Sequence, residues 1–169
     1  RAYRGAHPTN TVAGAALAIT LPLGEYKEDK LLNLGQNRFI IRPQIGVVHM
    51  RGPWSFELTG SVFIFTDNNQ FWNGNKREQD PLLAAQSHVI YSFPNKIWAS
   101  LSVGAVRAGE SKINGEEKND EKEDFLYAVS AGMPITRTSS MKIAYARGRT
   151  RQNVGSDADN IAFGFIHAF

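Results

Sequence analysis

The stretch Trp54-Ser-Phe-Glu-Leu-Thr-Gly-Ser-Val-Phe-Ile64 alternates between large apolar side chains and small or polar ones. Successive side chains of a β-strand point to opposite faces, so this stretch predicts a strand with one apolar face and one polar face. The apolar positions are Trp54, Phe56, Leu58, Val62 and Ile64, and the polar positions are Ser55, Glu57, Thr59 and Ser61.

The same alternation recurs along the chain and predicts eight strands. They are expected at Thr11–Leu23, Arg38–His49, Trp54–Thr66, Leu82–Phe93, Ile97–Ala108, Phe125–Ile135, Met141–Gly148 and Ile161–Phe169. No apolar run reaches the length of about 18 residues that a transmembrane helix needs. The sequence therefore predicts an all-β protein.

The connections between these strands are long and short in strict alternation. The long ones are Gly24–Asn37, Asp67–Asp80, Gly109–Asp124 and Arg149–Asp159, and the short ones are Met50–Pro53, Pro94–Lys96 and Thr136–Ser140. Alternation of residues alone would also fit a β-sandwich or a lipocalin-like barrel. A Greek-key sandwich needs crossing connections, whereas transmembrane barrels have short turns at one end and long loops at the other. The alternation of long and short connections predicts an antiparallel up-and-down transmembrane β-barrel in a bacterial outer membrane.

Composition agrees with a single barrel domain over residues 1–169. The mean hydropathy of −0.32 is low, but a barrel strand is apolar only at every second position. The absence of cysteine excludes thiol catalysis and disulfide staples. A formal charge of +3 with scattered basic residues gives no reason to expect nucleic acid. Arg1–Asn10 is expected to be a truncated strand or a turn, so the eight strands form either a complete barrel or the C-terminal part of a larger one.

The less apolar face is rich in glycine, alanine and serine, as expected of a barrel lumen. A polar cluster is predicted on it at Arg42, Gln44, Glu57, Gln86 and His88. A turn centred on Arg51–Gly52 would make Arg42 and Glu57 diagonal neighbours, and the cluster would then form one polar constriction. Acid–base chemistry by His88 and Glu57 is the alternative, but polar lumen ladders are usual in barrels. The stretch Asp67–Asn69 could offer oxygens to Ca²⁺, although a turn explains it better. No enzyme, metal or cofactor is predicted.

Two features are predicted on the apolar face. Aromatic residues near the short turns fit the girdle at a membrane interface, namely Trp54, Phe56, Tyr91 and Phe93. Arg107 and Arg147 share the parity of the lipid-facing residues at the end with long loops. We expect them to bind lipopolysaccharide phosphate, and the alternative is that they only reach towards water.

The sequence ends on alternating apolar residues and a terminal aromatic, with Phe165 and Phe169 in phase. This pattern resembles the signal that hands bacterial barrel proteins to their assembly machinery. The terminal strand is therefore expected to bind that machinery.

Several stretches resemble the family described as the putative MetA-pathway of phenol degradation, a set of outer-membrane barrels. The resembling stretches are residues 21–38, 42–46, 52–60, 65–69, 77–81 and 97–101. The resemblance implies a pore-like barrel and brings no catalytic residues with it. The leading expectation is a channel or transporter for small molecules, aromatic or apolar ones among them. A structural or surface-interaction barrel and a lipid-modifying enzyme are the alternatives.

Overall fold

The computed structural model describes residues 10–151 and 157–168 and consists of β-strands and their connections. Eight long strands form one sheet: β1 (Asn10–Thr20), β2 (Ile40–Arg51), β3 (Trp54–Phe65), β6 (Leu82–Ser92), β7 (Trp98–Ala108), β10 (Lys122–Pro134), β11 (Ser139–Thr150) and β12 (Ala158–His167). Four short strands form a second sheet: β4 (Asn68–Phe71), β5 (Asn75–Gln79), β8 (Ser111–Ile113) and β9 (Glu116–Glu117). In the part of the chain described, no helix is long and apolar enough to cross a membrane.

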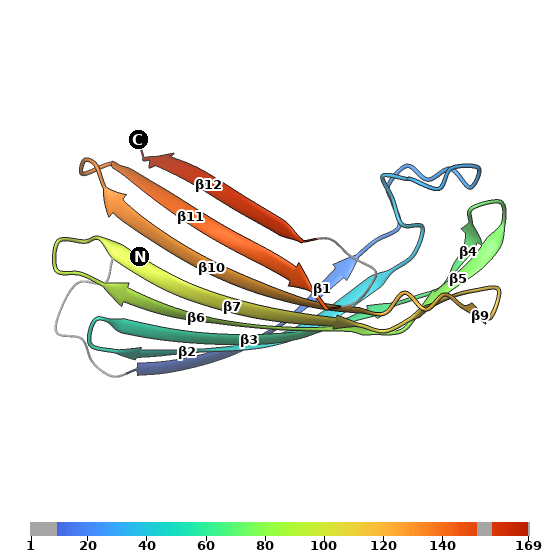
Figure 1. The fold of residues 1–169 in the computed structure, drawn as a ribbon, viewed down its shortest axis with the longest axis horizontal. Coiled ribbons are helices and arrows are strands. Elements are labelled where there is room, and N and C mark those ends of the chain that lie inside the picture. Colours follow the sequence, from blue (N-terminus) through green and yellow to red (C-terminus); the bar gives the residue numbers. More distant parts are fainter. Residues whose placement is uncertain (1–9, 152–156, 169) are drawn as a thin grey trace.

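The long strands follow one another in the sheet in chain order, and each pairs antiparallel with the next (Figure 1). All eight predicted segments are confirmed, with bounds that differ by a few residues. The largest differences are three residues: β1 ends at Thr20, β10 begins at Lys122 and β12 begins at Ala158. The all-β, up-and-down antiparallel prediction is correct.

The closure expected of a barrel is not seen among the described strands. β1 pairs with β2, β12 pairs with β11, and the two edge strands lie on opposite sides of a curved trough (Figure 1). A closed barrel would pair its first strand with its last, whereas the described sheet ends at β1 on one side and at β12 on the other.

The two ends of the sheet differ as predicted. The connections β2–β3, β6–β7 and β10–β11 are tight turns at one end, and the long connections β1–β2, β3–β6 and β7–β10 emerge at the other (Figure 1). The long connections Asp67–Asp80 and Gly109–Asp124 were expected to be loops, and that part of the prediction is wrong. They carry the second sheet, in which Arg77 of β5 pairs with Ile113 of β8.

Local backbone chemistry explains this second sheet. Asn114 and Gly115 have φ angles of 54° and 80° between β8 and β9, which is the two-residue turn that Asn-Gly favours because both residues tolerate positive φ. The β4–β5 hairpin turns through Trp72, Asn73 and Gly74, which also have positive φ. The external region is therefore an extension of the strand hairpins beyond the main sheet.

The two faces of the main sheet differ in exposure, as the first half of β3 shows. On β3 the apolar residues are more exposed than their neighbours: Leu58 is 55 % exposed, whereas Glu57 and Thr59 are half-buried. Side chains on the inner side of a curved sheet converge and shield one another, so we infer that the polar face is the concave one. This face carries the predicted lumen residues.

Candidate functional site

The register of β2 against β3 decides which polar side chains meet. Arg51 pairs with Trp54, so the turn is Gly52–Pro53 and Gly52 has φ of 59°. Glycine at the first central position defines a type II′ turn, and proline suits the negative φ of the second. The prediction that the turn centres on Arg51–Gly52 is wrong by one residue, and the register is consequently wrong by two.

Three cross-strand pairs on the concave face form a polar track. Glu57 lies opposite His88, Thr59 lies opposite Gln86, and Ser61 lies opposite Gln44. The track follows β3 along its length and takes its other side chains from β2 and β6. The structure therefore brings Glu57, Gln86 and His88 together, with Gln44 one step further along the strand. The cluster is a line along the wall and not a ring at one level.

Arg42 lies at the far end of this track and not beside Glu57. Its guanidinium carbon is 5.2 Å from the centre of the Phe63 ring, and Phe63 lies six positions along β3 from Glu57, or about 20 Å. The predicted diagonal contact between Arg42 and Glu57 is therefore absent. The Nε of Arg42 is buried without a hydrogen-bond partner in the described region, and the Phe63 ring provides a cation–π contact to the guanidinium.

Further polar side chains continue the concave face on the neighbouring strands. His88 Nδ1 and Ser102 Oγ are 2.7 Å apart, and the hydroxyls of Ser100 and Ser130 are also 2.7 Å apart. Lys142 shares this face, since it lies opposite Gly132 and Gly164. Sequence parity placed these residues on the lumen face, but only the register shows that the serines contact one another.

The arrangement suits solvation better than catalysis. Ser102 binds His88, but no hydrogen bond joins Glu57 to His88 in the described residues, so a serine–histidine–carboxylate relay is not assembled. Nor does the described part of the chain hold a group of three metal-ligating side chains. The Asp67 carboxylate, which was considered as a Ca²⁺ ligand, forms an ion pair with Lys76 at 2.8 Å. What the track offers is a series of hydrogen-bond donors and acceptors to water or a polar solute.

The aromatic residues near the tight turns form a contiguous cluster on the apolar face. The rings of Trp54 and Tyr91 meet edge-on at 4.7 Å, as do those of Tyr91 and Phe93. The Trp54 and Phe56 rings are stacked at 6.1 Å. The clustering predicted from the sequence is confirmed, and such a belt suits a membrane–water interface.

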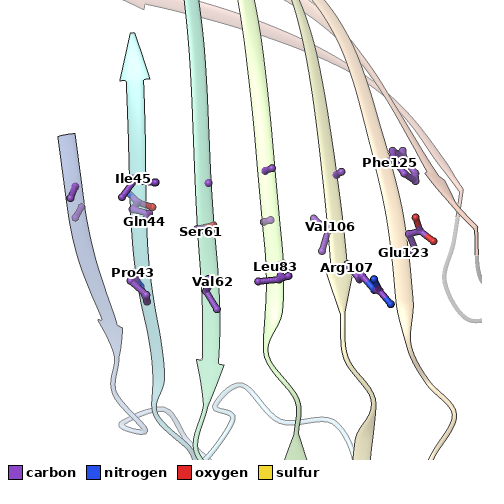
Figure 2. A pocket seen from close by; sticks show the side chains of 16 residues that line it. Pro43, Gln44, Ile45, Ser61, Val62, Leu83, Val106, Arg107, Glu123 and Phe125 are labelled. Atoms are coloured by element: carbon purple, nitrogen blue, oxygen red, sulfur yellow. The ribbon is translucent and has the colours of Figure 1, made fainter. Parts of the chain in front are cut away.

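A shallow depression of about 630 Å³ lies on the apolar face near the opposite end (Figure 2). Its floor consists of small residues at one level of three adjacent strands, where Gly60, Ala85 and Ala105 pair in sequence. Arg107 and Glu123 are opposite residues on β7 and β10 at its edge. The floor formed by these small residues is apolar.

Both predicted rim arginines face the apolar side at the end with the long connections. Arg107 lies opposite Leu83 and Glu123, and Arg147 lies opposite Tyr127 and Asp159. The Nε of Arg147 is 3.6 Å from an oxygen of Asp159, so this guanidinium already has a carboxylate neighbour.

The two residues of the predicted assembly signal differ in what can be described. Phe165 lies on the apolar face of β12 opposite Met141 and is 66 % exposed. Phe169 lies outside the described residues.

Comparison with known proteins gives two findings. The model of the family described as "Putative MetA-pathway of phenol degradation" matches residues 2–160. The fold is similar to the crystal structure of an outer membrane channel from Pseudomonas putida F1, with a TM-score of 0.78 and 26% sequence identity. The match covers 95% of this chain and 61% of the channel, so the chain spans less than two thirds of that protein. No curated protein matches the sequence.

Proposed function

Because the chain belongs to the family described as "Putative MetA-pathway of phenol degradation", we propose that it forms the wall of a channel for small molecules. The protein is an outer-membrane β-protein. The similarity to an outer membrane channel supports a channel in preference to an enzyme.

The observation that carries the proposal is the two-faced sheet with a polar track on its shielded side. Glu57, Thr59 and Ser61 follow one another on one face of β3 and are half-buried, while Trp54, Phe56, Leu58 and Ile64 on the other face are apolar and exposed. A sheet with one side in lipid and the other in water has this division. A soluble β-protein would bury the apolar face and expose the polar one.

The open edges of the sheet have to be paired in a membrane. Unpaired N–H and C=O groups of an edge strand have no hydrogen-bond partner in hydrocarbon, so spanning sheets close into barrels. We propose that β1 and β12 border further strands and that this sheet is part of a barrel wider than eight strands. Such a barrel leaves space between its walls, whereas the interior of an eight-stranded one is just wide enough for side chains to fill.

Small aromatic or apolar molecules are the proposed permeants. Lipopolysaccharide is the proposed lipid partner, at Arg107 and Arg147, with an acyl chain in the depression that Gly60 floors. The barrel assembly machinery is the proposed partner of the terminal strand, through Phe165 and Phe169.

The proposal is tested by conductance measurements on the protein purified from outer membranes and inserted into planar bilayers. Stepwise openings are expected. Replacement of Arg42 by Ala removes a positive charge from the concave face and should shift the ion preference towards cations. A folded protein without conductance would favour a barrel that does not transport.

A further inference from the structure

A pocket of about 390 Å³ lies at the external end of the concave face, between the main sheet and the second sheet. It is lined from three sides: by Tyr26 and Leu31 of the connection before β2, by Phe65 at the end of β3, and by Arg77 of β5. Arg38, which precedes β2, completes the wall. The pocket thus depends on the connection before β2 and the β4–β5 hairpin lying beside the end of β3.

The connection before β2 is held in place by its own hydrogen bonds. The backbone nitrogen of Gly35 donates to the carbonyl of Glu25 at 3.0 Å. At this point Gly24 and Gly35 approach so closely that a Cβ on Gly24 would be 2.9 Å from the Cα of Gly35. The buried amide of Asn68 then donates to the hydroxyl of Tyr26 at 3.0 Å, which ties this connection to β4. The pocket wall is therefore held in position by defined hydrogen bonds and close backbone packing.

Two guanidinium groups dominate the electrostatics of the pocket. Arg38 is only 6 % exposed, and its guanidinium carbon lies 4.4 Å from the centre of the Phe65 ring. Arg77 lies 5.2 Å from the Phe71 ring in the same way. Burial and the nearby charge of Arg77 lower the pKa of Arg38 to about 10, so that Arg38 still carries its charge at neutral pH.

The charge of this pair is not neutralised from within the pocket. Arg38 donates to the side-chain oxygens of Gln36 and Gln79, which are neutral acceptors, and its Nη1 is buried without a partner in the described residues. The residues that line the pocket include no aspartate or glutamate. Asp120 is near enough to Arg77 to be stabilised by its charge, but its carboxylate accepts hydrogen bonds from Ser111.

We propose that this pocket binds a small organic carboxylate, with its carboxyl group between Arg38 and Arg77 and its apolar part against the leucine and aromatic side chains. A hydrogen bond from a guanidinium to a carboxylate is stronger than one to a neutral acceptor, and a carboxylate would supply the acceptor that Nη1 of Arg38 lacks. The volume is within the usual range for small-molecule sites and exceeds what an inorganic anion needs. Tyr26, Leu31, Leu32 and Phe71 provide the apolar contacts.

The position of the pocket connects it with the polar track. Arg38 over Phe65 and Arg42 over Phe63 are two successive guanidinium–phenyl pairs along β3, one from the residues before β2 and one from β2 itself. A carboxylate released from the pocket would next meet Arg42 on the concave face. This step from binding to permeation rests on the proposed channel function, whereas the binding site itself rests on the geometry of the external region.

Binding is measured by calorimetry on the folded protein in detergent, with benzoate as the probe and benzyl alcohol as its neutral counterpart. Benzoate should bind saturably and benzyl alcohol should not. Replacing Arg77 by Gln, or Arg38 by Gln, should weaken benzoate binding by about tenfold or more. Lys76→Gln is the matched control, because it removes the same charge from the next residue of β5, whose side chain pairs with Asp67 and Glu78.

The possible results distinguish failure of the proposed carboxylate site from failure of the proposed channel function. Equal binding of benzoate and benzyl alcohol, or equal loss in Lys76→Gln, overturns the carboxylate site, as does inorganic phosphate binding as tightly as benzoate. The buried Arg38 variant can fail to fold, and Arg77→Gln then decides. Benzoate flux into proteoliposomes is measured in parallel. Arginine-dependent binding without any flux keeps the site and refutes the channel.

Discussion

Gly132 on β10 lies directly beneath the indole ring of Trp98 on β7, and this contact gives a quantitative prediction. A Cβ at position 132 would be 2.5 Å from both Cε2 and Nε1 of Trp98 and 2.7 Å from Cζ2. Ordinary carbon contacts need about 3.5–4.0 Å, so the ring would have to move by about 1 Å. Gly132→Ala should therefore destabilise the folded protein by about 1–3 kcal/mol, the usual cost of overpacking.

The sign of this effect should reverse when the indole is removed. In a Trp98→Ala background the alanine at position 132 meets no ring, and alanine is favoured over glycine within a strand by about 0.5–1 kcal/mol. The two substitutions should thus couple by at least about 1.5 kcal/mol in a double-mutant cycle. Gly60→Ala is the control, because a Cβ there has nothing within 4 Å.

Unfolding by urea in lipid vesicles is the assay, followed by the gel mobility of folded and unfolded protein because one variant lacks a tryptophan. Equal cost of Gly132→Ala in the two backgrounds would refute the close approach of the indole. It would also place Trp98 off the concave face, against the register of β7 with β10.

Three further predictions concern the membrane. Cysteines at Asn73 and Gly115 should react with an impermeant thiol reagent on intact cells, and labelling at Asn95 instead would invert the orientation. Replacing Arg107 and Arg147 together by Gln should lower the melting temperature in lipopolysaccharide but not in phosphate-free detergent; equal changes in the two media would remove the lipid role. Deletion of Phe169 should reduce insertion into the outer membrane, and a normal amount of heat-modifiable protein there would show that the terminal aromatic is not needed.

The long strands could be predicted from the sequence because apolar residues recur at every second position over ten or more residues. The strand β5, Asn75–Gln79, has no such face, since its residues are all polar, and alternation cannot mark it. Turn chemistry could have revealed the external sheet instead, because Asn114-Gly115 is a strong hairpin signal.

The sequence could predict which side of the sheet each candidate residue occupies, but not which residues contact one another. Alternation alone puts Arg42 and Glu57 on the same side of the sheet. A register error of two residues does not change the side, because side chains repeat with a period of two. Their separation depends on the turn at Gly52–Pro53, where glycine takes the positive φ. The pair Arg38 and Arg77 was beyond reach of the sequence, because Arg38 was expected to begin a strand and Arg77 to lie in the loop 67–80, and alternation gives no sign that they line one pocket.

The division of the sheet into a water-facing and a lipid-facing side is the central claim, and cysteine scanning along β3 tests it most directly. Single cysteines from Phe56 to Val62 would be probed in the folded protein in lipid vesicles with a small, charged thiol reagent. The account predicts that cysteines at Glu57, Thr59 and Ser61 react, while those at Phe56, Leu58 and Val62 do not. Uniform reactivity along the strand, or reaction at the apolar positions alone, would contradict it.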